Sequence, residues 1–186
     1  MNEEGGYKCL KNQTFSDGEF SIVPIRYEDR FHIMRWRNEQ IHHLRQAKPL
    51  TEQDQDHYFK QVIAKLYDQE KPDQILFSYL QNGTCIGYGG LVHINWIDKN
   101  AELSFIIDTK LEQEAFRTHW HHYLDLIEKP AFDELKLHKL FTFAFDIRPH
   151  LYAVIEAKGY LKEAELKDHC CVNGEYKNVI IHSKIK

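Results

Sequence analysis

Glu102 is the first residue whose type and position suggest chemistry. It lies inside a short run, residues 101–107, whose mostly apolar composition predicts a β-strand. A carboxylate at such a place usually needs a reason, because acidic residues are almost never fully buried unless they are paired. Glu102 can act as a general base, or it can lie on the solvated face of a strand whose other face is apolar. The sequence leaves both interpretations open.

A second group of useful side chains follows a helical pattern and reads Arg35-Trp36-Arg37-Asn38. Aromatic and guanidinium groups at a helix end can stack on a sugar or a base and hold phosphates. An acceptor that carries a nucleotide diphosphate would make Arg37 and Arg45 useful, whereas a protein N-terminus would not require them. Alternatively, Trp36 anchors the helix in the core and the arginines lie in solvent. We take Trp36, Arg37, Asn38 and Arg45 as candidate substrate-binding residues.

Three histidines, His119, His121 and His122, raise the question of a metal site. His119 and His122 would share a helical face, and such a pair can bind zinc when a third ligand is available. Nothing in the sequence indicates which residue would be the third ligand, and in a chain with 12 histidines such clusters arise easily by chance. The four cysteines also follow no metal-binding spacing. We therefore expect no metal.

Composition narrows the class of protein. With 186 residues, of which 42% are hydrophobic and 13% aromatic, the chain can bury a substantial core. A net charge of −4 gives no electrostatic reason to expect nucleic acid as a partner. No apolar run approaches the roughly 20 residues that a membrane span needs. The first residues are acidic where a signal peptide would be basic, so we expect a cytoplasmic protein.

Strands and helices alternate along the chain, and they must position these side chains. We predict an N-terminal leader of uncertain order, residues 1–18, followed by one domain, residues 19–186. The predicted elements are an edge strand 20–25, helices 28–38 and 51–67, a hairpin 75–80 and 84–94, strand 101–107, helix 108–137, strand 139–145, helix 147–158 and a final antiparallel hairpin 160–172 and 176–185.

Residues 101–145 thus form a strand–helix–strand unit with parallel strands. In open α/β sheets, ligands bind at the carboxyl ends of the strands, beside the start of the helix. We therefore expect the segment after residue 107 to decide the function.

The order of elements resembles the GNAT acyltransferase superfamily over residues 20–185. Within it, the sequence is most similar to nucleotide-sugar amine N-acetyltransferases and to enzymes that acetylate the N-termini of ribosomal proteins. The resemblance rests on the order and spacing of short motifs: Arg35-Trp36-Arg37-Asn38, Lys48-Pro49-Leu50-Thr51, Cys85-Ile86-Gly87-Tyr88, Ala101-Glu102-Leu103 and Glu156-Ala157-Lys158-Gly159-Tyr160. It implies a single α/β domain with a mixed central sheet of about seven strands, about four helices and splayed central parallel strands.

The resemblance also implies an activity, which is transfer of an acyl group from acyl-CoA, with acetyl-CoA as the expected donor. The acceptor would be the primary amine of a small molecule such as an amino-sugar nucleotide, or a protein N-terminus. Glu102 would be the base and Tyr152 the nearest available acid. The protein would be a monomer or a homodimer. The implied cofactor-binding residues are Phe105, Ile106, Ile107, Lys110, Phe116, Arg117, Thr118, His119, Trp120 and Arg148.

Two departures from the family pattern support an alternative function. The family holds pyrophosphate on a glycine-rich loop, but the corresponding residues 115–120 contain no glycine. The tyrosine that serves as acid in the family falls on Ile155. The alternative is a GNAT-fold module without cofactor that binds a small molecule or a partner protein. In that case Phe116 or Trp120 would fill the slot between the central strands, whereas an enzyme would keep the slot open.

Overall fold

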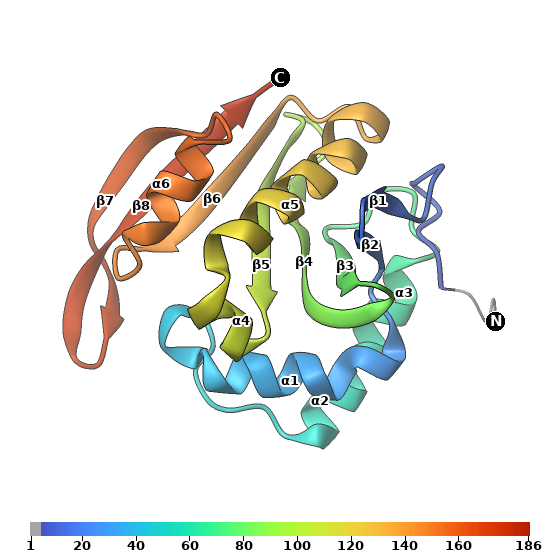
Figure 1. The fold of residues 1–186 in the computed structure, drawn as a ribbon, viewed down its shortest axis with the longest axis horizontal. Coiled ribbons are helices and arrows are strands. Elements are labelled where there is room, and N and C mark those ends of the chain that lie inside the picture. The colour runs from blue at the N-terminus through green and yellow to red at the C-terminus, as the bar shows by residue number, and fades with distance from the viewer. Residues whose placement is uncertain (1–4) are drawn as a thin grey trace.

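A mixed eight-stranded sheet forms the centre of the computed structural model, which describes residues 5–186 (Figure 1). The strand order is β1-β2-β3-β4-β5-β6-β8-β7, and only β5 and β6 are parallel neighbours. The strands are β1 (Phe15–Asp17), β2 (Phe20–Pro24), β3 (Ile75–Gln81), β4 (Thr84–Asn95), β5 (Asn100–Ile107), β6 (Lys139–Phe145), β7 (Leu161–Val172) and β8 (Glu175–Ile185). The α/β class and the mixed sheet are confirmed, with one strand more than predicted.

Helices pack on both sides of this sheet, and α5 crosses the face formed by β4 and β5 (Figure 1). The helices are α1 (Arg30–Glu39), α2 (Glu52–Tyr58), α3 (Ala64–Leu66), α4 (Thr109–Glu114), α5 (Phe116–Glu128) and α6 (His150–Glu156). Two π-helical segments, Phe59–Ile63 and Lys129–Glu134, continue α2 and α5. Within residues 5–186, no helix is long and apolar enough to cross a membrane.

The extra strand is β1, which lies in the segment expected as an N-terminal leader. Residues 1–4 of that segment fall outside the described residues. Tyr7 is almost completely buried, and its hydroxyl exchanges hydrogen bonds with the backbone of Leu76, at 2.8 and 2.9 Å. β1 pairs with β2, so β2 has neighbours on both sides and is not the edge strand that the sequence suggested.

The predicted hairpins are confirmed, and their turns require particular residues. Asn82 and Gly83 both have positive φ, at 49° and 79°, as a two-residue turn between antiparallel strands demands. Gly89, in β4, faces β5 so closely that a Cβ there would lie 2.1 Å from the carbonyl oxygen of Ser104. The glycine cluster of β4 therefore serves close strand packing, as expected, and not a phosphate loop.

The predicted helix 108–137 is interrupted near its start. Asp108 caps α4 by accepting a hydrogen bond from the backbone N–H of Lys110, at 2.9 Å. Ala115 then departs from helical geometry, with φ −139° and ψ 26°, and α5 begins at Phe116. The segment expected as a cofactor loop, residues 115–120, is therefore mostly the first turns of α5.

The central parallel strands separate, as predicted. β5 and β6 pair at only three positions, which end at Glu102 and Phe141. Beyond Glu102, β5 continues to pair with β4 as far as Ile107, and β6 continues to pair with β8 as far as Phe145. The two halves of the sheet diverge from this point, so the inner edge of each strand loses its neighbour (Figure 1).

Candidate active site

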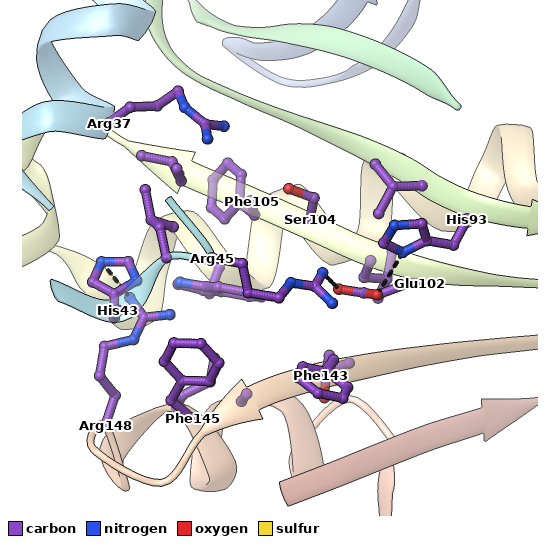
Figure 2. Close-up of a pocket in the computed structure, with 18 of the residues that line it drawn as sticks. Arg37, His43, Arg45, His93, Glu102, Ser104, Phe105, Phe143, Phe145 and Arg148 are labelled. Carbon is purple, nitrogen blue, oxygen red and sulfur yellow. Dashed lines mark hydrogen bonds and ion pairs between the residues drawn. The ribbon is translucent and has the colours of Figure 1, made fainter. Parts of the chain in front are cut away.

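A cavity of about 480 Å³ occupies the space between the diverging strands (Figure 2). Ser104, Phe105 and Ile106 of β5 line one side, and residues 142–145 of β6 line the other. Trp120 of α5 contributes to the wall, where its ring meets that of Phe105 edge-on at 5.1 Å. The slot between the central strands is therefore open, and neither Phe116 nor Trp120 fills it.

Glu102 lies at the inner end of the cavity, where β5 and β6 still pair. Only 7% of its side chain is exposed, so the interpretation as a carboxylate on a solvated face is wrong. One carboxylate oxygen accepts a hydrogen bond from the guanidinium of Arg45, and the other lies 2.8 Å from Nδ1 of His93 (Figure 2). Arg45 also stacks over the ring of Phe143, at 4.8 Å. Two basic partners thus hold this buried carboxylate.

Sequence reasoning missed His93, and a β-bulge explains its position. Val92 pairs with Glu102 while Asn95 pairs with Asn100, so β4 holds one residue more than β5 in this stretch. His93 adopts a φ of 50° at the bulge, and bulges re-aim side chains in this way. The signal was available in part, because counting back from the short connection between Asn95 and Asn100 places His93 within one residue of the position opposite Glu102.

The four candidate substrate-binding residues divide into two groups. Arg37 and Arg45 line the cavity. Trp36 is buried and its indole N–H donates to the carboxylate of Asp108 at 2.8 Å, so it ties α1 to the start of α4. Asn38 exchanges two hydrogen bonds of 2.8 Å with the backbone of Leu50 and so holds the segment between α1 and α2. Trp36 and Asn38 position the site and do not face the cavity.

An ion pair lies at the outer end of the cavity, beyond the ends of β5 and β6. Arg148 donates to Glu112 of α4 at 2.7 Å and lies 3.5 Å from Nε2 of His43. Burial raises the pKa of Glu112 although Arg148 opposes this shift, and burial lowers the pKa of Arg148. Burial and the nearby Arg148 also lower the pKa of His43 to about 3, so this imidazole is neutral near pH 7.

The predicted cofactor-binding residues lie in four different surroundings. Phe105, Ile106, Trp120 and Arg148 line the cavity. The carbonyl of Ile107 accepts a hydrogen bond of 2.7 Å from the amide of Gln40, and Phe116 packs on Trp120 and His150. Lys110, Arg117 and Thr118 are exposed near the start of α5. His119 is the exception, because it is buried in the core.

His119 faces the opposite side of α5 from the cavity. Its Nδ1 lies 3.3 Å from the hydroxyl of Tyr79, and its ring packs edge-on against Phe20. His122, its partner in the metal interpretation, stacks on Phe20 and lies near Asp17. Among residues 5–186, no three side chains form a cluster suited to a metal ion.

Tyr152, the predicted acid, lies outside the ring of described residues that line the cavity. Its hydroxyl donates to the carboxylate of Asp146 at 2.8 Å, and its ring stacks on His182. Burial and the nearby carboxylate of Asp146 raise its pKa. The hydroxyl proton of Tyr152 is therefore directed to Asp146 and not into the cavity. The sequence motif could not reveal this, because the turn that contains Asp146 sets the direction of the Tyr152 side chain.

The cavity has features that suit an acyl-CoA. The apolar wall formed by Phe105, Phe143 and Phe145 suits the thin arm that carries the thioester. β5 has no ladder partner beyond Glu102 on this side, so its free backbone groups can pair with amides of that arm. At the outer end, the first N–H groups of α5 lack acceptors within the helix and carry the positive end of its dipole. The apolar wall, the free backbone groups of β5 and the first N–H groups of α5 therefore fit an acyl-CoA.

Comparison with known proteins agrees with this geometry. The family model described as Acetyltransferase (GNAT) domain matches residues 22–181. The chain belongs to the GNAT acetyltransferase family. No curated protein sequence matches it.

Solved structures with the same fold include a spermidine N-acetyltransferase from Vibrio cholerae in complex with CoA and spermine, with a TM-score of 0.77 and 20% identity over 91% of this chain and 96% of that one. Mutant forms of the Vibrio cholerae spermidine/spermine N-acetyltransferase give a TM-score of 0.73 and 21% identity over 91% and 95%. A dodecameric form of the spermidine enzyme matches with a TM-score of 0.73 and 20% identity over 91% and 95%. At these identities, the likeness supports the fold of this GNAT member.

Proposed function

We propose that the protein transfers an acetyl group from acetyl-CoA to the primary amine of a small molecule. The observation that carries the proposal is the open cavity between β5 and β6, with a buried, doubly paired carboxylate at its inner end. The membership of the GNAT acetyltransferase family supports transfer of an acetyl group. The structural neighbour bound to spermine makes a polyamine the first acceptor against which others must be compared.

The residues of the chain support this reaction by binding, orienting and moving protons. The acyl-CoA supplies an electrophilic thioester. We propose that the edge of β5 at Phe105, Ile106 and Ile107 holds the pantetheine arm. The first turn of α5, with Arg117 and Lys110 nearby, holds the pyrophosphate through backbone N–H groups and positive charge.

An amine must lose a proton before or during its attack, because the protonated form has no free electron pair. We propose that Glu102 accepts this proton through a bridging water, as the buried carboxylate nearest the inner end of the cavity. Arg45 and His93 hold the carboxylate in place, and the exposed side of His93 offers the proton a path to solvent. No described tyrosine lines the cavity as the acid for the leaving thiolate, so solvent supplies that proton in this scheme.

Calorimetry with acetyl-CoA and with free CoA tests the proposal directly. We expect micromolar affinity for both, because the shared part of the two ligands makes most of the contacts. Lys65→Gln is the control variant. It removes an exposed charge that does not line the cavity, so it should bind both ligands as the unchanged protein does. Absence of binding at millimolar ligand would overturn the proposal in favour of a binding module without cofactor.

A further inference from the structure

A second cavity, of about 410 Å³, adjoins the first one on the side of α1 and α2. Its wall is mainly apolar and aromatic, and includes Ile33, Leu50, Phe59, Leu76 and Tyr58. Four residues line both cavities: Arg37, Gln74, Val92 and Ser104. The two cavities therefore share a wall, and a molecule bound in the second one can reach the first past these four side chains.

The shared wall lies beside the carboxylate described above. Val92 is the residue of β4 that pairs directly with Glu102 of β5, and Ser104 follows Glu102 on the same strand. An amine that extends past Val92 from the second cavity thus arrives at the inner end of the first, near Glu102 and His93. This geometry gives the second cavity the place of the acceptor.

Arg37 is the notable charge on that wall. Its Nε donates to the amide oxygen of Gln46 at 2.9 Å, and its Nη1 donates to the hydroxyl of Tyr88. Both partners are neutral, and no carboxylate among residues 5–186 lies within ion-pair distance of its guanidinium. A half-buried guanidinium without a counter-charge is unfavourable, so a bound anion at this place would complete the site.

Carboxylates on the second cavity are scarce. Asp54 is the single acidic residue among the described residues of its lining, and it completes the capping box of α2 by accepting from the N–H and the hydroxyl of the N-cap Thr51, at 3.0 and 2.8 Å. A polyamine carries several positive charges and would find here an apolar wall and Arg37. A nucleotide diphosphate would place its strongly hydrated phosphates against the same apolar wall, which is costly.

We propose that the second cavity binds the acceptor as an apolar α-amino acid. Its side chain packs against Phe59 and Leu76, its carboxylate pairs with Arg37, and its amine points past Val92 toward Glu102. This inference rests on the proposed function and adds the class of acceptor. In the reaction, the new N–C bond to the acetyl carbon replaces the C–S bond of the thioester. The nitrogen loses one proton, and the released thiolate gains one.

Three acceptors separate the parts of this inference: L-phenylalanine, phenethylamine and spermidine. Phenethylamine has the apolar ring and the amine but lacks the carboxylate, and spermidine lacks the apolar body. Release of CoA from acetyl-CoA, followed with a thiol reagent, gives kcat/KM for each. We expect the value for L-phenylalanine to exceed both others by roughly tenfold or more, as a charge-assisted hydrogen bond at Arg37 allows. An equal or higher value for spermidine or phenethylamine overturns the inference.

Arg37→Gln tests the proposed carboxylate contact. We expect KM for L-phenylalanine to rise by roughly tenfold or more while KM for phenethylamine stays unchanged. Lys65→Gln is the control, because Lys65 is exposed and lines neither cavity. A parallel change for both acceptors in Arg37→Gln would contradict a contact with the carboxylate.

Leu50→Phe provides a second variant that does not depend on Arg37. Leu50 is partly exposed on the cavity wall, so a larger side chain there narrows the cavity without disturbing the core. We expect the preference to move from L-phenylalanine toward L-alanine or L-valine, and an unchanged ratio overturns the placement of the side chain.

Calorimetry with acetyl-CoA distinguishes a wrong class of acceptor from a wrong proposed function. If acetyl-CoA binds and spermidine is acetylated instead of amino acids, the further inference fails and the proposed function stands. If acetyl-CoA does not bind, both fail. If acetyl-CoA binds and L-phenylalanine and its apolar relatives give no turnover, the class of acceptor is wrong.

Discussion

Two arginine–glutamate pairs lie at the two ends of the cavity, and their surroundings differ. At the inner end, Glu102 is 7% exposed and shared between Arg45 and His93, whose own side chains are 47% and 64% exposed. At the outer end, Arg148 and Glu112 are 16% and 15% exposed, so both partners are removed from water together. Residue type is the same in both pairs, and accessibility is not.

This difference in accessibility suggests that one pair can exchange protons and that the other has a structural role. A carboxylate whose basic partners reach solvent can take up a proton and pass it on, because at least one partner can exchange it with water. A pair in which both members are largely shielded from water holds two segments together, here α4 and the connection after β6. We therefore propose that the inner pair takes part in the reaction and that the outer pair fixes the shape of the outer opening.

Glu102→Gln gives the largest expected effect. The amide keeps the shape of the side chain and cannot accept the proton, so we expect kcat to fall by about 100-fold or more. Binding of acetyl-CoA, measured by calorimetry, should stay the same because Glu102 lies away from the outer end. An unchanged kcat would remove Glu102 as the base and end the distinction between the pairs.

Glu112→Gln should show the opposite pattern. It leaves the guanidinium of Arg148 without a counter-charge, and we expect the free energy of unfolding to fall by about 2 kcal/mol. Urea unfolding followed by circular dichroism measures this value. Glu114→Gln, on the same helix, is the matched control, because Glu114 is exposed and forms only a 4.0 Å ion pair with Lys110. Equal changes in the free energy of unfolding for the two variants would show that the ion pair between Arg148 and Glu112 does not stabilise the fold.

Acid should weaken the outer end first. The pKa of His43 is lowered from 6.5 to about 3 in the folded protein, in surroundings that include Arg148, His42 and His150. Between these values the unfolded chain binds a proton at His43 that the folded chain does not, so the contribution of His43 lowers stability as the pH drops below about 6.5. From pH 6.5 to 5, we expect His43→Gln to lose about 1 kcal/mol less than the wild type, after allowance for partial solvent exposure. Parallel pH curves for the two proteins would contradict this.

His93→Gln should give the smallest effect. The amide of Gln can keep a hydrogen bond to Glu102 but cannot carry a proton to solvent, so we expect kcat to fall by roughly fivefold. The diagnostic result is the pH profile of kcat, which should change shape if His93 exchanges protons. A fall in kcat with an unchanged profile would assign His93 a purely structural role.

The order of elements from residue 20 onward was predicted from the sequence, except for the break between α4 and α5, whereas β1 was missed and the divergence of β5 and β6 was implied by the family resemblance. Alternation of apolar residues, Asn-Gly turns and a strand–helix–strand unit are local signals, and the family resemblance supplied the rest of the topology. The sequence marked Glu102 as a carboxylate inside a strand and Arg37 and Arg45 as groups that could hold phosphates, and all three line the cavity, while their roles remain proposals.

The remaining errors came from contacts between distant segments. The position of His93 depends on a one-residue bulge between β4 and β5. The direction of Tyr152 depends on Asp146, and the burial of His119 depends on Tyr79 and Phe20. A sequence pattern gives the spacing of such residues along the chain but not the partner that captures each side chain.

The hydrogen bond between Trp36 and Asp108 joins α1, beside the second cavity, to the start of α4, beside the first. Asp108 caps α4 beside the outer end of the first cavity, and Trp36 belongs to α1, which contributes Ile33 and Arg37 to the wall of the second cavity. If occupation of one cavity shifts α1, we expect this hydrogen bond to carry the shift to α4 beside the other. By thermodynamic reciprocity, any gain in affinity for acetyl-CoA caused by the acceptor must equal the gain for the acceptor caused by acetyl-CoA, and Trp36→Phe should reduce both by the same factor.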